Sequence, residues 1–264
     1  MLLIQIYKLK MGLSSSEPKI NSISQKLRVI GYIDGFNTFY GIKETNRREN
    51  YWYNPIEIVK RVATLAGSEI EIVEVNFFTA MLNHDSRRLP RQQNYINALT
   101  ATPLIHIRYG RFNADPSYCR CCKQEHPKMQ EKNSDVNLAT ALVFDALHDR
   151  YDVAVLISGD SDFVGPVERI LEKFPNKVII AGFPPNRRSD ALHIATKKRS
   201  AQLHDWVLAK CHLPEVVISK SGKNQYTRPD EWTKEAGDVL EAIKNKKVAD
   251  MLNSKFGNPD KRGH

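Results

Sequence analysis

Short apolar runs rich in Val and Ile alternate along this chain with longer segments whose apolar side chains recur at helical spacing. The runs predict β-strands at 28–33, 69–79, 104–109, 152–157 and 177–181. The longer segments predict helices at 55–66, 87–99, 135–148 and 162–174, and a helical turn at 38–42. Repeated βα units of this kind predict an α/β fold with a mostly parallel central sheet and helices on both faces.

Three segments interrupt the alternation. Residues 110–133 carry clustered cysteines and little apolar content, so we expect a loop there. Residues 219–228 are polar and contain glycine, which favours a linker or loop. Residues 229–256 carry spaced apolar side chains and predict a last helix.

Carboxylates follow two of the predicted strands at the point where each strand ends. Asp34 follows the run 28–33, and Asp160 and Asp162 lie within Ser158-Gly159-Asp160-Ser161-Asp162, directly after 153–157. The ligand crevice of an open α/β sheet lies at the carboxyl ends of its strands. We therefore expect these acids to converge, with Asp135 joining them from the start of its helix.

Helix capping is the local alternative for each of these acids, because Asp and Ser accept hydrogen bonds from the first turn of a helix. Ser161 or Asp162 is expected to cap the helix that follows, and Ser134 or Asp135 the helix at 135–148. Capping alone does not account for matching acids at two strand ends. Carboxylates brought together need a proton or a cation, and hard oxygen ligands select Mg²⁺ or Mn²⁺.

Taken together, Y-I-D-G-F-N, E-K-x-x-D-V-N-L-A and L-I-S-G-D-S-D-F resemble the NYN domain family of the LabA-like, DUF88 type. These are PIN-like, metal-dependent ribonucleases with a three-layer α/β fold. The resemblance covers about 28–206 and extends to the R-P-x-E-W stretch at 228–232. It implies an N-terminal tail at 1–26, an NYN domain at 27–213 with a Cys-bearing insertion at 110–133, and a C-terminal extension at 214–264.

The resemblance implies a Mg²⁺- or Mn²⁺-dependent nuclease that hydrolyses phosphodiester bonds, with an endoribonuclease as the first hypothesis. Asp34, Asp135 and Asp160 are the expected metal ligands, and Asp162 is expected to bind a second ion or to orient water. The full set of implied catalytic residues is Asp34, Asp135, Asp160, Asp162, Asn37 and Ser158.

Two alternatives use the same residues differently. A non-catalytic nucleic-acid-binding or regulatory module of this fold would retain the sheet without cleaving. A phosphatase with an aspartate nucleophile would place a second Asp two positions after the first, whereas here Asn37 comes three positions after Asp34. The complete acidic set favours the nuclease over the non-catalytic module, and the position of Asn37 disfavours the phosphatase.

The net charge of +9 favours an anionic partner, nucleic acid first. The resemblance to the NYN family implies RNA more than DNA. Basic side chains flank segments expected near the strand ends. The expected phosphate contacts are Arg187, Arg188, Lys197, Lys198 and Arg111. Tyr40, Tyr109 and the run 51–53 are candidates for stacking on unpaired bases.

Cys119, Cys122 and His126 have a spacing compatible with structural zinc, which requires four nitrogen or sulfur ligands. A mobile loop with free thiols is the competing interpretation, and Cys211 and His212 would complete a site only if the fold brings them close. Four cysteines without a persuasive signal peptide favour a reducing, cytoplasmic setting. No apolar run approaches the length of a membrane span, so we expect no membrane partner.

Overall fold

The computed structural model describes residues 26–67, 69–83, 85–119 and 121–233, without the side chains of 114–117, 119 and 125–130. Its centre is a six-stranded sheet in the order β3-β2-β1-β6-β7-β8, in which every neighbouring pair is parallel. The strands are β1 Leu27–Asp34, β2 Ile70–Thr79, β3 Ile105–Tyr109, β6 Val153–Ile157, β7 Val178–Phe183 and β8 Ser200–Gln202. The predicted α/β fold with a parallel sheet is therefore confirmed.

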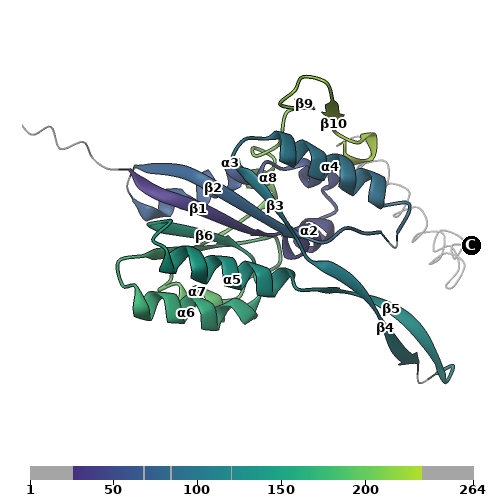
Figure 1. The fold of residues 1–264 in the computed structure, drawn as a ribbon, viewed down its shortest axis with the longest axis horizontal. Coiled ribbons are helices and arrows are strands. Elements are labelled where there is room, and N and C mark those ends of the chain that lie inside the picture. The colour runs from purple at the N-terminus through teal and green to yellow at the C-terminus, as the bar shows by residue number, and fades with distance from the viewer. Residues whose placement is uncertain (1–25, 68, 84, 120, 234–264) are drawn as a thin grey trace, which may run out of the picture.

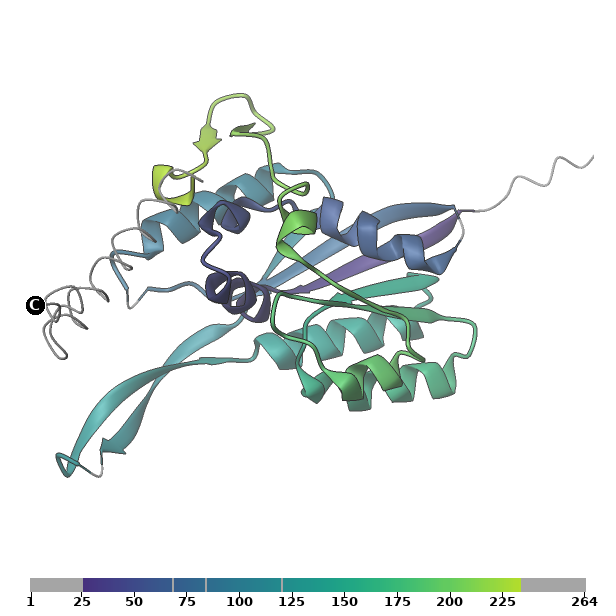
Figure 2. The same cartoon turned by 180° about the vertical axis from the view of Figure 1, so that it is seen from behind.

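Helices cover both faces of this sheet, as Figures 1 and 2 show. One layer contains α3 Pro55–Ala63, α4 Leu89–Ala101 and α8 Asp205–Leu208, and the other contains α5 Ser134–Leu147, α6 Val164–Lys173 and α7 Asp190–Ala195. The remaining helix, α2 Gly35–Glu44, follows directly from β1. The short 3-10 helices are η1 Arg48–Trp52, η2 Thr64–Ala66, η3 Ser161–Phe163 and η4 Asp230–Trp232.

The two faces of the central strands belong to two separate hydrophobic cores. Val29 and Ile33 of β1 pack into the core beneath α3 and α4, whereas Ile30 and Tyr32 pack into the core beneath α5 and α6. All four side chains are fully buried. A strand buried on both faces reads as a continuous apolar run, which is why β1 and β6 were predictable.

The segment 110–133 is not the predicted loop. It forms an antiparallel hairpin of β4 Arg111–Cys119 and β5 Gln124–Lys132, which projects away from the sheet in Figures 1 and 2. Strand signals in sequence come mainly from side chains that pack on a core, and this ribbon extends away from both cores. It also places Pro116 opposite Pro127, and proline is unusual within paired strands.

The stretch after 213 was expected to contain a linker at 219–228. It contains a second antiparallel hairpin, β9 Val216–Ile218 and β10 Gln225–Thr227, so that expectation is correct only for the turn between these strands. Trp232 follows and packs against Tyr51 and Tyr95. Of the segment 229–256, where a last helix was expected, the structure describes only residues 229–233, which contain η4. Residues 1–25 of the expected N-terminal tail also lie outside the described residues.

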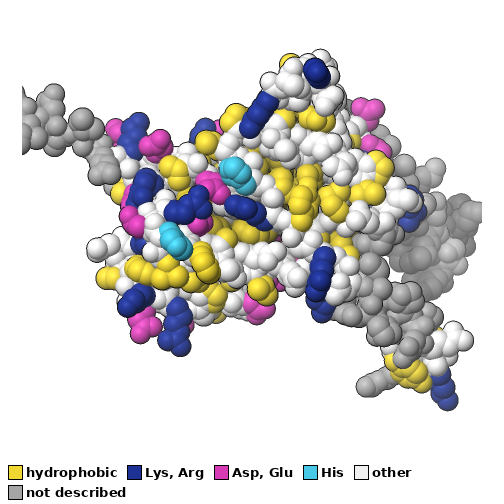
Figure 3. Space-filling model, in the orientation of Figure 1, with side chains coloured by type: hydrophobic (Ala, Val, Ile, Leu, Met, Phe, Trp, Pro, Cys, Tyr) yellow, Lys and Arg dark blue, Asp and Glu magenta, His cyan; other side chains and the backbone are white. Residues whose placement is uncertain are grey.

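The surface in Figure 3 shows Lys and Arg side chains scattered in several groups on that face, and hydrophobic side chains gathered along α5. Within the described part of the chain, no helix has the length and apolar character needed to cross a membrane.

Candidate active site

The ends of β1 and β6 bring the first site residues together. Ile33 of β1 is in register with Ile157 of β6, so Asp34, the last residue of β1, lies beside Ser158, the first residue after β6. The Ser158 hydroxyl donates a hydrogen bond of 2.9 Å to Oδ2 of Asp34. The sequence prediction that these two motifs share one edge of the sheet is thus supported by a direct contact.

Three backbone amides complete a hydrogen-bond network around Asp34. The amide of Asn37 donates to Asp34 Oδ1 at 2.9 Å, and the amide of Gly159 donates to Asn37 Oδ1 at 3.0 Å. The amide of Asp160 donates to the Ser158 hydroxyl at 3.1 Å. The turn after β1 and the turn after β6 are therefore fixed to one another, which holds the carboxylates in place.

Helix capping explains part of this geometry, but not as predicted. Asp34 caps α2, and Asp160 caps η3 by accepting from the amide of Asp162 at 3.0 Å. The expected cap from Ser161 or Asp162 is wrong, because α6 begins after Phe163 without a side-chain cap.

The expected cap of the helix at 135–148 is also wrong. Helix α5 begins at Ser134, and its N-cap is Asn133, which has a left-handed backbone with φ of 77°. Asp135 therefore lies in the first turn of α5, half-buried and without a capping bond of its own. Its carboxylate is available to a ligand.

Burial and mutual repulsion act on these carboxylates. Asp34 is only 6% exposed, and its pKa is raised to about 7, mainly by burial. The hydrogen bonds from Asn37 and Ser158 act in the opposite direction, while the charges of Asp135 and Asp160 raise the pKa further. The pKa of Asp135 is also raised, first by burial and then by Glu131, Asp160 and Asp162. The four predicted acids therefore share one electrostatic environment.

The donor set of this acidic group suits a hard divalent cation. All its ligand atoms are carboxylate oxygens, and none of its four Asp side chains pairs with a described Lys, Arg or His. Among the described residues, however, no three Asp, Glu, His or Cys side chains stand close enough together to enclose an ion. A hard cation at this group would therefore be held through few carboxylates and would keep part of its water shell.

Glu131 is an acidic neighbour that the sequence prediction did not include. Its Oε1 accepts from the amide of Ser134 at 3.2 Å, and its charge acts on Asp135. It lies at the end of β5, where the hairpin meets α5. The sequence did contain a signal, since Glu131 stands four residues before Asp135 in the E-K-x-x-D motif. However, residues 110–133 were expected to form a loop, and a loop gave no reason to place Glu131 near the acids.

The predicted phosphate-binding residues lie in different places. The backbone of Arg187 packs against Gly159, and its side chain pairs with Glu44. Arg188 pairs with Asp190 at 2.9 Å. Arg111 begins β4, whereas Lys197 and Lys198 lie in the turn before β8, at the start of a strand rather than at its end. Of this set, Arg187 has its backbone against the turn that carries Asp160, and Arg111 follows Gly110, which lies against Ser134 and Glu131 near Asp135.

The predicted zinc ligands are described only in part. Cys121 and Cys122 are exposed, whereas the side chains of Cys119 and His126 lie outside the description. Cys211 is buried in the core, where its sulfur accepts from Arg61 Nε at 3.1 Å, and His212 lies 3.0 Å from Asn50 Oδ1. Cys211 and His212 thus have partners of their own, and zinc in the hairpin stays a prediction.

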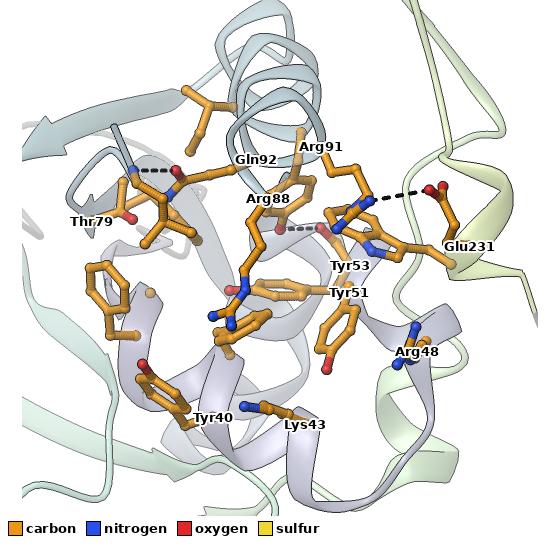
Figure 4. A pocket seen from close by; sticks show the side chains of 18 of the residues that line it. Tyr40, Lys43, Arg48, Tyr51, Tyr53, Thr79, Arg88, Arg91, Gln92 and Glu231 are labelled. Atoms are coloured by element: carbon orange, nitrogen blue, oxygen red, sulfur yellow. Dashed lines mark hydrogen bonds and ion pairs between the residues drawn. The ribbon is translucent and has the colours of Figure 1, made fainter. Parts of the chain in front are cut away.

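A cavity of about 670 Å³ lies beside the acids and was not predicted (Figure 4). It is bounded by α2, η1, the end of β2, α4 and η4. Three of the aromatic residues considered for base stacking, Tyr40, Tyr51 and Tyr53, line it. Trp52 and Tyr53 are buried, and Tyr109 is exposed at the end of β3.

The chain is 24% identical over 242 residues to 6-hydroxy-3-succinoylpyridine 3-monooxygenase HspA of Pseudomonas putida, a match that covers 79% of this chain and 76% of that protein. A crystal structure of a protein of unknown function from Vibrio parahaemolyticus is 19% identical, with a TM-score of 0.44, covering 68% of this chain and 94% of the other. The NYN domain model matches residues 28–200, so this chain belongs to the NYN domain family.

Proposed function

We propose that this protein is a metal-dependent nuclease, and specifically an endoribonuclease that hydrolyses phosphodiester bonds at the acidic group of Asp34, Asp135, Asp160 and Asp162. Membership of a PIN-like nuclease family supports the reaction class. The observation that carries the proposal is Asp34, a buried carboxylate held by two hydrogen bonds, near other acids and without a cationic partner among the described residues. The negative charge of such a buried group must be neutralised by a bound cation or by a proton.

The side chains have distinct roles in this proposal. Asp34, Asp135 and Asp160 would supply the carboxylates for Mg²⁺ or Mn²⁺, with no more than two of them on the ion in the present arrangement and water completing its shell. Exposed Asp162 would orient water or contact a second ion. A bound ion supplies Lewis-acid stabilisation of the phosphoryl oxygens and lowers the pKa of water. Ser158 is a positioning residue rather than a nucleophile, since its hydroxyl donates to Asp34 and accepts from the amide of Asp160. Asn37 positions Asp34 and links it to Gly159.

Metal removal tests the proposal directly. We expect the purified protein to cut labelled single-stranded RNA internally with Mn²⁺ or Mg²⁺ and to stop cutting in EDTA, with activity restored by excess metal. Single-stranded DNA of the same sequence should be cut more slowly. Cleavage that persists in EDTA would contradict the metal-dependent mechanism. RNA binding without cleavage under any metal would support the non-catalytic alternative.

Binding of RNA should weaken as salt rises, because basic side chains release condensed counterions when they contact phosphates. Arg188 is available for such a contact, since its ion pair with Asp190 is exposed and contributes little. In filter-binding titrations, Arg188→Gln should reduce the slope of log affinity against log salt by about 0.7 if one phosphate contact is lost. Arg169→Gln on α6, where the side chain is 84% exposed, is the matched control. An unchanged slope in the Arg188 variant would remove Arg188 from the RNA interface.

A second candidate activity comes from the Pseudomonas relative, whose name describes a monooxygenase acting on a hydroxylated succinoylpyridine. The observation that favours it is the neighbouring cavity, whose aromatic walls and basic side chains suit a small aromatic acid. A monooxygenase would consume dioxygen and two electrons from a reductant. Oxygen uptake that depends on 6-hydroxy-3-succinoylpyridine, with no RNA cleavage, would favour this activity over the nuclease.

A further inference from the structure

The cavity beside the acidic group has walls of aromatic rings that hold one another in place. Phe39 and Tyr51 stack with centroids 5.0 Å apart, and the Tyr51 ring meets the edge of Trp232 at 5.5 Å. The rings of Trp232 and Tyr95 meet edge to face with their centroids 6.1 Å apart. The Tyr95 hydroxyl donates a hydrogen bond to the backbone carbonyl of Tyr53. Rings fixed in this way form a preformed surface on which another planar ring can stack.

Basic side chains lie among these rings. Figure 4 shows Arg88 reaching from the start of α4 towards α2, where Tyr40 and Lys43 stand, with Arg48 on another side. Neither Lys43 nor Arg48 pairs with an acidic side chain among the described residues. Burial raises the pKa of the Tyr51 hydroxyl, and Arg48 and Arg88 act in the opposite direction, so both guanidinium groups lie within electrostatic reach of Tyr51. The cavity is therefore suited to a planar ring with an anionic group.

The position of the cavity connects it to the acids. Gly35, which lines it, directly follows Asp34, and Phe77 and Thr79 line it from the end of the adjacent strand β2. Burial raises the pKa of Tyr53, and the charge of Asp34 acts in the same direction, which places Tyr53 within electrostatic reach of the acidic group. A nucleic acid strand bound at Asp34 thus lies close to an aromatic cavity that begins at the next residue of the chain.

One wall of the cavity is formed by η4, which lies C-terminal to the residues that the NYN domain model matches. The NYN match ends at residue 200, whereas Glu231 and Trp232 belong to η4. Glu231 pairs with Arg91 of α4 at 3.1 Å, which fixes η4 over the cavity. The R-P-D-E-W stretch therefore has a structural role here, since it supplies a ring to the cavity.

We propose that this cavity is a base-binding subsite, which takes one unpaired nucleobase of an RNA strand between its aromatic rings and contacts the adjoining phosphate with Lys43, Arg48 and Arg88. The proposal rests on the proposed nuclease function for its substrate class. A cavity of about 670 Å³ lies within the usual range for small-molecule sites. Stacking accepts any base, so the subsite favours single-stranded over paired RNA without strict sequence selection.

Calorimetric binding to the full chain in EDTA tests the subsite without cleavage. The probes are uridine and adenosine 5′-monophosphates, ribose 5-phosphate, which lacks a base, and nicotinate as a small aromatic acid. We expect both nucleotides to bind about 10-fold more tightly than ribose 5-phosphate, because only they stack. Nicotinate should bind more weakly than the nucleotides.

Two variants separate the contribution of base stacking on Tyr51 from that of the positive charge of Lys43. Tyr51→Leu should weaken nucleotide binding about 10-fold and leave ribose 5-phosphate unaffected. Lys43→Gln, an exposed change that the fold will tolerate, should weaken nucleotides and ribose 5-phosphate by the same factor of about 3. Trp206→Leu, whose ring is 63% exposed outside the cavity, and Arg169→Gln are the matched controls and should change neither.

The outcomes distinguish the subsite from the nuclease itself. Nucleotides that bind no better than ribose 5-phosphate, or that bind equally to wild type and both cavity variants, would overturn the subsite even if the protein cleaves RNA. Nicotinate binding more tightly than either nucleotide would overturn it in favour of a small aromatic acid. The predicted binding pattern in a protein that never cleaves RNA would support the subsite and contradict the nuclease.

Discussion

Replacing Asp160 by asparagine is expected to lower metal-dependent RNA cleavage by at least about 100-fold while leaving the fold intact. The change keeps the shape of the side chain but removes a charge that a hard cation requires. An amide oxygen can still accept the bond that Asp160 Oδ1 receives from the amide of Asp162, so the start of η3 is preserved. Loss of about 3 kcal/mol of metal-derived transition-state stabilisation corresponds to this factor.

Initial rates of RNA cleavage, together with Mn²⁺ affinity from calorimetry, provide the measurement for Asp160→Asn. The matched control is Glu168→Gln, which removes one negative charge from an exposed position on α6 after the same turn. Its rate should stay near that of wild type, and both variants should unfold at similar temperatures. An Asp160→Asn protein that cleaves at the wild-type rate would show that the acidic group is not where the reaction occurs.

The contact between the end of β1 and the turn after β6 was predictable because it depends on chain direction alone. Asp34 and Ser158 follow apolar runs that could only be inner strands, and parallel neighbours end at the same edge of a sheet. The distances of 2.9 Å and 3.0 Å that fix Asp34, Asn37 and Gly159 were not predictable. They depend on which turn follows each strand, and sequence motifs do not determine that geometry.

The cavity could not have been predicted in the same way. Its rings come from α2, η1, α4 and η4, elements that are up to about two hundred residues apart in the chain and that meet only through tertiary packing. Tyr51 and Trp52 are adjacent in sequence, yet Tyr51 lines the cavity while Trp52 is fully buried. A run of aromatic residues indicates that rings are present, but it does not separate those that pack inside from those that face a ligand.

A single methyl group at Gly159 is expected to disrupt both stability and cleavage. A Cβ atom built there would lie 1.6 Å from the carbonyl oxygen of Arg187 and 2.6 Å from its carbonyl carbon. These are backbone atoms, so rotation of a side chain cannot relieve the clash. The turn after β6 or the loop after β7 must move, and a shift of the turn after β6 displaces the Gly159 amide from Asn37.

Gly159→Ala should therefore unfold at a temperature several degrees below that of wild type, because overpacking of this kind costs about 1–3 kcal/mol. Cleavage should fall further than stability alone explains, since Asn37 and Ser158 then no longer hold Asp34 and Asp160 in their present relation. Thermal unfolding monitored by circular dichroism, with cleavage rates measured well below the transition, separates the two effects.

Gly165→Ala is the matched control, because it adds the same methyl group six residues later, where no heavy atom lies within 4 Å of the new Cβ. Gly165 is exposed in the first turn of α6, and alanine stabilises a helix relative to glycine by up to about 1 kcal/mol. This variant should be slightly more stable than wild type and equally active. If Gly159→Ala instead matched Gly165→Ala in both measurements, the close packing of the Arg187 backbone on the turn after β6 would be wrong, and with it the basis for placing Arg187 beside the acids.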